Sequence, residues 1–121
     1  MKENIIVDKT YAFASRMVKL HKHLTLEQKE YVLSKQVLRS GTSIGANVEE
    51  AVAASSRADF IHKLTIAAKE ARETAYWLRL LHDNDYLPSL LFQSVYQDID
   101  EIKRIIGSIV ISTKIDRKSV V

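Results

Sequence analysis

Residues Pro88 to Ser112, PSLLFQSVYQDIDEIKRIIGSIVIS, show the clearest structural pattern in the sequence. At alternating intervals of three and four positions this stretch carries the apolar residues Phe92, Val95, Ile99, Ile102, Ile106 and Ile109. An α-helix with this spacing presents all of them along one face, which it can bury against other helices. Pro88 suits the first helical turn, where its missing amide proton costs nothing. The stretch therefore predicts an amphipathic helix over residues 88–112.

Three stretches upstream show the same helical periodicity. Each has a residue near its start that can accept the free amide protons of a first helical turn: Asp8, Thr25 and Ser56. The four expected helices span residues 8–23, 26–53, 57–83 and 88–112. Because helices joined by so few residues must be neighbours, the sequence predicts an all-α, antiparallel up-down four-helix bundle over residues 1–113. We expect residues 114–121 to form a solvated, flexible basic tail.

Two glycines, Gly41 and Gly45, lie inside the second expected helix. Each costs about 1 kcal/mol relative to alanine in a helix interior. Since they are four residues apart, they share one face of the helix, and a neighbouring helix that approaches unusually closely would compensate for them. The alternative is a break in the helix over residues 40–45.

The composition of the 121 residues is that of one ordinary globular domain, with 46% apolar and 27% charged residues. The absence of cysteine excludes disulfides, thiolate metal sites and cysteine nucleophiles. The net charge is +3, and the expected tail supplies most of it through Lys114, Arg117 and Lys118. No apolar run is long enough for a signal peptide or a membrane span, so we expect a cytoplasmic protein without a membrane partner.

No motif in the sequence predicts catalysis or metal binding. Asp59 and His62 have the spacing of a carboxylate–histidine metal pair, but a di-iron bundle needs two such pairs and two further glutamates. There is no glycine-rich phosphate loop and no nucleophile elbow. The sequence therefore predicts neither an enzyme nor a bound metal, cofactor or small-molecule substrate.

A polar ridge runs beside the two glycines. At intervals of four, four and three residues it holds Arg39, Ser43, Asn47 and Glu50. The third expected helix returns antiparallel past this ridge, which places Glu70 and Glu73 about level with Arg39. A partly buried Arg–Glu pair would fix the register of the two helices, because such groups need hydrogen-bond partners. The alternative is a ligand or phosphate site at the ridge.

The third and fourth expected helices carry more apolar residues than one buried stripe requires. Residues that we expect in an interface between copies are Tyr76, Trp77, Leu80, Leu91 and Ile105. If all of this surface faced water, it would form a larger apolar patch than soluble monomers usually show. The sequence therefore predicts self-association. The alternative is a monomer whose long side chains wrap around the edge of the bundle.

The stretch Leu38–Ala51, LRSGTSIGANVEEA, resembles the Arg-Ser-x-x-Ser-Ile-x-x-Asn-Ile/Val-x-Glu signature of the bacterial four-helix bundle proteins. These are also called the S23 ribosomal or 23S rRNA intervening-sequence protein family, and the likeness continues through residues 58–64 and 67–74. The resemblance implies an up-down four-helix protomer, a ring-shaped homopentamer and no established catalytic activity. Many members carry Glu-Gly where this chain has Glu50-Ala51, so the exit from the second helix can differ.

Two functions remain open. The first is a non-catalytic assembly or adaptor scaffold whose partner is further copies of itself. The second is a ring-shaped RNA-binding accessory protein, since a related branch, the accessory variability protein of diversity-generating retroelements, is a basic pentamer tied to nucleic acid. For contact with RNA or DNA phosphates we expect the cations near the end of the last helix and in the tail: Lys103, Arg104, Lys114, Arg117 and Lys118.

Overall fold

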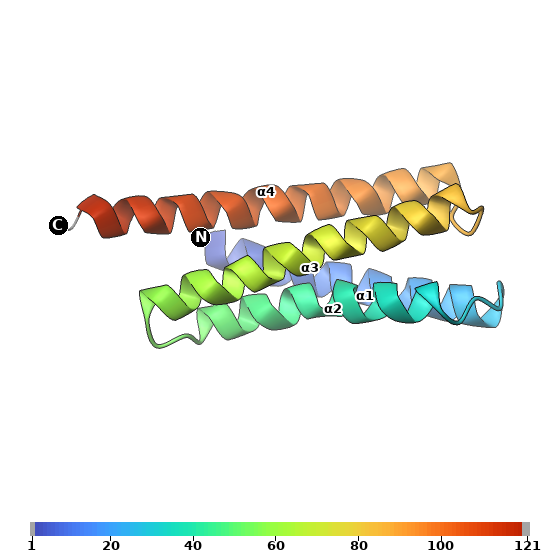
Figure 1. The fold of residues 1–121 in the computed structure, drawn as a ribbon, viewed down its shortest axis with the longest axis horizontal. Helices are drawn as coiled ribbons and strands as arrows, with labels where there is room; N and C mark the ends of the chain where they lie inside the picture. The colour runs from blue at the N-terminus through green and yellow to red at the C-terminus, as the bar shows by residue number, and fades with distance from the viewer. Residues whose placement is uncertain (1, 120–121) are drawn as a thin grey trace.

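The computed structural model describes the backbone of residues 2–119 and the side chains of residues 5–115. Four helices and no strand occupy that part of the chain, so the expected all-α class is confirmed. In Figure 1 the helices lie side by side and each runs back along the one before it. They are α1 (Lys2–Leu26), α2 (Leu33–Val52), α3 (Arg57–Asp83) and α4 (Ser89–Ser119).

The core lies between the four helices and holds the apolar stripes that the sequence predicts. Each helix packs against its neighbour in the chain, and α4 returns to pack against α1, which is the loosest of the four contacts. Among the side chains that the core buries most completely are Phe13, Met17, Ile44, Leu64, Leu78, Ile99, Ile102 and Ile106. The helical stripe in residues 88–112 is therefore the core face of α4.

The helix bounds agree with the sequence for α3. Its first turn is capped as expected, because the Ser56 hydroxyl accepts a hydrogen bond from the Asp59 amide at 3.1 Å. The expected caps of the first two helices are wrong. Asp8 lies inside α1, which begins at Lys2, and the Thr25 hydroxyl donates to the His21 carbonyl at 2.9 Å within the same helix.

Glu30 caps α2 in place of Thr25, so that this helix begins at Leu33 and not at residue 26. Its carboxylate accepts hydrogen bonds from the amides of Val32, Leu33 and Ser34 at 3.2, 3.0 and 2.7 Å. Lys29, with φ of 56°, turns the chain just before it. Burial alone would raise the pKa of Glu30, but the three amide hydrogen bonds together lower it below its ordinary value.

The fourth helix is longer than expected. It begins at Ser89, directly after Pro88, whose carbonyl accepts from the Phe92 amide at 2.9 Å. It continues to Ser119, so the backbone of the expected tail is helical through that residue. The last turns of α4 run beyond the other helices at that end of the bundle (Figure 1).

The helix α2 is continuous through both glycines, so a break over residues 40–45 does not occur. A Cβ atom at Gly41 would collide with the buried side chain of Met17 on α1. One at Gly45 would lie 3.3 Å from the carbonyl oxygen of Thr10, also on α1. The close approach of α1 therefore compensates for the cost of the two glycines in α2, as the sequence predicts.

Candidate functional site

Arg39 on α2 bridges to two carboxylates of α3. Its guanidinium forms an ion pair with Glu73, and its Nη1 lies 3.4 Å from an Oε2 of Glu70. Nε also donates to the Oε1 of Gln36 at 3.2 Å. The Glu70 side chain is 14% exposed while that of Arg39 is 49% exposed, so the pair stands at the edge of the helix interface. Glu70 and Glu73 therefore lie level with Arg39 along the two helices, as the sequence predicts.

An aromatic pair extends this network along α3. The indole Nε1 of Trp77 donates to the carboxylate of Glu73 at 3.0 Å. The rings of Tyr76 and Trp77 meet edge to face, with centroids 5.0 Å apart. Glu73 is therefore shared between Arg39 and Trp77, and this sharing fixes the orientation of all three side chains.

The remaining ridge residues hydrogen-bond within their own helix. The Ser43 hydroxyl donates to the Arg39 carbonyl at 2.7 Å, and the Asn47 amide donates to the Ser43 carbonyl at 2.9 Å. Glu50 is exposed and makes no side-chain hydrogen bond or ion pair with the residues that the structure describes. The arrangement around Arg39 is thus one of satisfied contacts between α2 and α3, and Glu50 stands apart from it.

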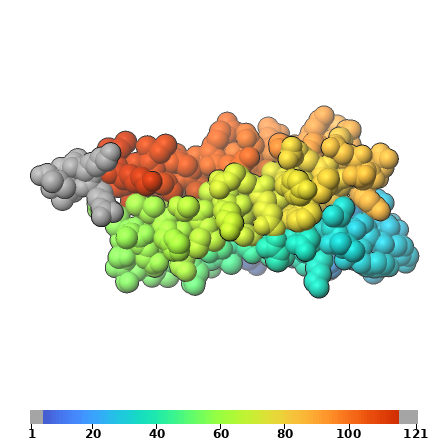
Figure 2. All heavy atoms as spheres, in the orientation of Figure 1, coloured from blue at the N-terminus to red at the C-terminus, as the bar shows by residue number. Residues whose placement is uncertain are grey.

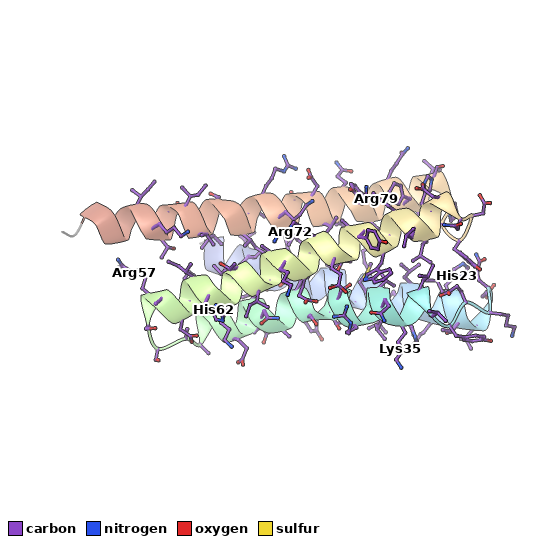
Figure 3. All side chains as sticks on the ribbon, viewed as in Figure 1. His23, Lys35, Arg57, His62, Arg72 and Arg79 are labelled. Carbon is purple, nitrogen blue, oxygen red and sulfur yellow. The ribbon has the colours of Figure 1, made fainter. Side chains whose placement is uncertain are left out.

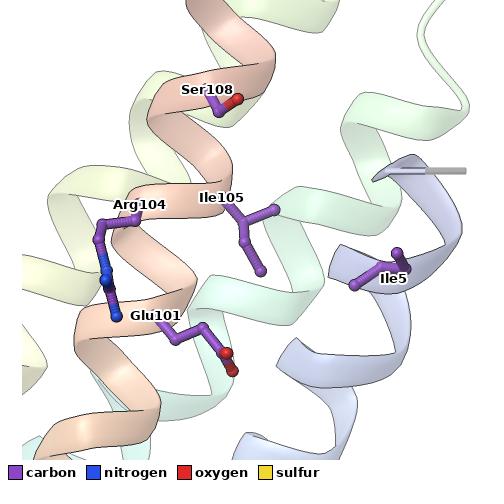
Figure 4. A pocket seen from close by; sticks show the side chains of 5 residues that line it. All are labelled: Ile5, Glu101, Arg104, Ile105 and Ser108. Carbon is purple, nitrogen blue, oxygen red and sulfur yellow. The ribbon is translucent and has the colours of Figure 1, made fainter.

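The cations expected to contact nucleic acid do not form one cluster. Arg104 pairs with Asp100 on the same helix at 3.4 Å, and it faces a cavity of about 350 Å³ between α1 and α4. Figure 4 shows Ile5 of α1 opposite Ile105 in this cavity. Lys103 lines a different cavity, a groove against α3. Lys114 is exposed, and the side chains of Arg117 and Lys118 lie outside the described residues.

The expected interface residues divide between two surfaces. Tyr76 is 48% exposed on α3, next to half-buried Trp77 and Leu80. Leu91 and Ile105 are half-buried and line cavities between α1 and α4. None of the five is fully buried within the protomer, and they do not form one continuous patch.

Two ion pairs bridge the loose side of the bundle, between α1 and α4. Lys9 lies 2.6 Å from Glu101, and Arg16 lies 2.6 Å from Asp98. The hydrogen bond from Lys9, and its positive charge, lower the pKa of Glu101 below its ordinary value. Electrostatic contacts thus supplement the apolar packing along this side.

A groove between α3 and α4 has the features of a binding surface, and the sequence did not predict it. Its cavity of about 350 Å³ is lined by Leu64, Thr65, Ala68, Arg72, Lys103, Ile106, Gly107, Val110 and Ile111. Figure 2 shows the two helices side by side along this face. The sequence feature that could have indicated the groove is a cation one helical turn from a small residue on each helix. Arg72 is four residues from Ala68, and Lys103 is four residues from Gly107.

The outward face of α3 is basic because its central acids point elsewhere. Glu70 and Glu73 pair with Arg39, whereas Lys69, Arg72 and Arg79 are exposed. Figure 3 labels Arg72 and Arg79 along this helix. Tyr76 lies on the same face, at three and seven residues from two of these cations. The sequence did not predict this face, since the contacts expected for nucleic acid lie in α4 and beyond it.

Two kinds of site are absent from the described part of the chain. No group of three histidine or acidic side chains there could hold a metal ion. In the same part of the chain, none of the helices is both long and apolar enough to span a bilayer.

The chain is similar to proteins of one family over nearly its whole length. The family model for 23S rRNA-intervening sequence protein matches residues 2–108. A crystal structure from Bacteroides thetaiotaomicron VPI-5482, of a protein with unknown function from the S23 ribosomal protein family, is 55% identical in sequence. It superposes with a TM-score of 0.90 and covers 91% of this chain and 98% of its own. No curated protein matches. This chain belongs to the 23S rRNA-intervening sequence protein family.

Proposed function

We propose that this protein is a non-catalytic scaffold, an up-down helical bundle whose copies assemble into a closed ring. The observation that carries the proposal is the apolar surface that the folded protomer leaves in water. Ile111 and Ile115 on the last turns of α4 are 61% and 58% exposed. At the opposite end, Leu26, Val32 and Leu90 are 71%, 71% and 83% exposed.

Exposure of this kind supports assembly because Ile111 and Ile115 are four residues apart and therefore adjacent on one face of α4. A soluble monomer tolerates scattered apolar residues, but contiguous exposed patches usually mark contacts with other molecules. The C-terminal end of α4 extends beyond the other helices (Figure 1), so another copy can pack against this end of the helix. A ring of five, which the family resemblance implies, is one arrangement that covers such a surface in every copy.

The double variant Ile111→Glu, Ile115→Glu tests this proposal by sedimentation equilibrium. We expect the assembly to dissociate at protein concentrations at which the unaltered protein stays associated, while the helix content of the protomer is retained. Tyr11→Glu is the matched control, since Tyr11 is 67% exposed on a different helix. An unaltered protein that is itself monomeric, or a double variant that assembles normally, would contradict the proposal.

A second candidate function is contact with nucleic acid. The basic outward face of α3 favours it, because Lys69 and Arg79 are exposed there without a side-chain ion pair among the described residues, and Tyr76 lies between them. Cations bind phosphates, and an exposed aromatic ring can stack on a base. This surface lies on α3, whereas the sequence predicted contacts near the end of α4.

A further inference from the structure

The acids Glu49 and Glu50 stand out because nothing within the protomer uses them. Both are exposed, and neither has a side-chain partner among the residues that the structure describes. Ala46 on α2 and Ala53, the residue that caps the end of this helix, are also exposed. These two alanines are seven residues apart and share one line along the helix, and the two glutamates flank that line. We call Ala46, Glu49, Glu50 and Ala53 the acidic ridge.

The groove between α3 and α4 carries charges opposite to those of the acidic ridge. Arg72 and Lys103 line it from its two sides, and no acidic residue is among its lining residues. Neither cation has a side-chain partner within the described part of the chain. Ala68 and Gly107 lie one turn further along, and a Cβ added at Gly107 would meet no atom within 4 Å. The groove is therefore open and largely apolar, with one cation on each helix that forms it.

We propose that the acidic ridge of one copy docks into the α3–α4 groove of the next copy. This inference rests on the proposed self-assembly and specifies which two surfaces meet. The small residues of the ridge and of the groove allow two helices to approach closely, as Gly41 and Gly45 allow within the protomer. The glutamates on either side of the ridge then face Arg72 and Lys103, and Ile111 at the end of the groove is covered.

Each copy presents its ridge to one neighbour and its groove to another, so the contact is heterologous. A heterologous contact repeats from copy to copy and gives a closed ring when the rotation between copies closes. Both surfaces lie in the half of the bundle nearer to the α2–α3 turn, since they hold the end of α2 and the first half of α3 (Figure 1). Neighbouring copies can therefore lie side by side with their axes roughly level.

Disulfide trapping tests this pairing cleanly, because the chain contains no cysteine. The variants Ala46→Cys, Ala53→Cys and Gly107→Cys each introduce one thiol at an open position. Under mild oxidation we expect a disulfide-linked dimer when Gly107→Cys is mixed with Ala46→Cys or Ala53→Cys, and little dimer from any single variant alone. Lys35→Cys is the matched control: it lies on the same side of α2 as Ala46, about 16 Å away along the axis, and should not link.

Charge exchange gives a second, independent measurement. Glu49→Lys with Glu50→Lys should weaken assembly by at least about a hundredfold in dissociation constant, and so should Arg72→Glu with Lys103→Glu, since each brings like charges together. Combining all four substitutions restores opposite charges across the contact, and we expect assembly to recover. Circular dichroism checks that each variant keeps its helices.

The outcomes separate this inference from the proposed function. The docking of these two surfaces is overturned if the protein assembles but gives no mixed disulfide. It is also overturned if the variant with all four charge substitutions does not recover assembly. In both cases the proposal of self-assembly itself is retained. Linking of Gly107→Cys to itself would also overturn it, because that result requires a symmetric contact. If the unaltered protein is monomeric, both proposals fail together.

Discussion

The side chain of Met17 on α1 packs directly over the backbone of Gly41 on α2. Met17 is completely buried, and a side chain at position 41 would occupy the space of its Cγ atom. The close approach of α1 and α2 therefore depends on the absence of a side chain at this one position. Glycine at position 41 costs about 1 kcal/mol in helix propensity, and the packing of Met17 offsets this cost.

The variant Gly41→Ala should lower the stability of the protein, although alanine is the better helix former. Overpacking a filled core typically costs about 1–3 kcal/mol, which exceeds the gain of about 1 kcal/mol from propensity. We expect a net loss of about 1 kcal/mol in thermal unfolding. Gly107→Ala is the control, since its added methyl group meets open space and should stabilise the helix. Equal effects at both positions would argue against the packing of Met17 as the reason for Gly41.

The variant Arg39→Ala distinguishes a structural pair from a ligand site. Because the Arg39 side chain is about half exposed, water screens the pair, and we expect a loss of about 1 kcal/mol. This corresponds to a melting temperature lower by about 4 °C. Lys35→Ala, on the same helix and without an ion pair in the described structure, should change the stability by less than about 0.5 kcal/mol. An unchanged melting temperature for Arg39→Ala would favour the ligand site.

Glu30 should make the stability of the protein depend on pH. Its folded-state pKa is lowered, so its contribution is fully present above the unfolded value of about 4.3. The contribution is lost as the pH falls through the lower folded value. Glu30→Ala should therefore cost about 1 kcal/mol at neutral pH, and the difference from the unaltered protein should vanish in acid. Glu27→Ala, exposed in the same turn, is the control and should show no such difference at any pH.

Binding to RNA should depend on the basic residues of the outward face of α3. A fluorescence anisotropy titration with a structured RNA at two salt concentrations measures it. Lys69→Glu with Arg79→Glu should weaken binding by at least tenfold and reduce its salt dependence, whereas Lys35→Glu should have a smaller effect. Tyr76→Ala should weaken binding about tenfold if the ring stacks on a base. Binding that is absent, or indifferent to salt, would argue against this second function.

The sequence predicted the helices well where local chemistry decides their ends. Ser56 and Asp59 form the predicted cap, because both partners lie in the same turn. The similar pattern at Thr25 was misleading, since the buried Leu24 keeps α1 helical past it and leaves the capping of α2 to Glu30. That choice depends on the packing of α1 in the bundle, which a local pattern does not contain.

The candidate surfaces were harder to predict, because charged side chains choose between partners on different helices. The pairing of Arg39 with Glu70 and Glu73 followed from helix register alone. Lys103 and Arg104 are adjacent in sequence, yet Lys103 lines the groove against α3 and Arg104 lines the cavity against α1. The groove beside Lys103 forms only when α3 packs against α4 and brings Arg72 next to it. The pairing of these two cations is therefore a property of the packed bundle.

The molar mass of the unaltered protein in solution shows whether its copies assemble. Light scattering coupled to size-exclusion chromatography at micromolar concentration measures it without a label or a variant. We predict one species at an integer multiple of the 13.8 kDa protomer, with five as the multiple for the ring that the family resemblance implies. A single species of 13.8 kDa at every concentration would contradict the account.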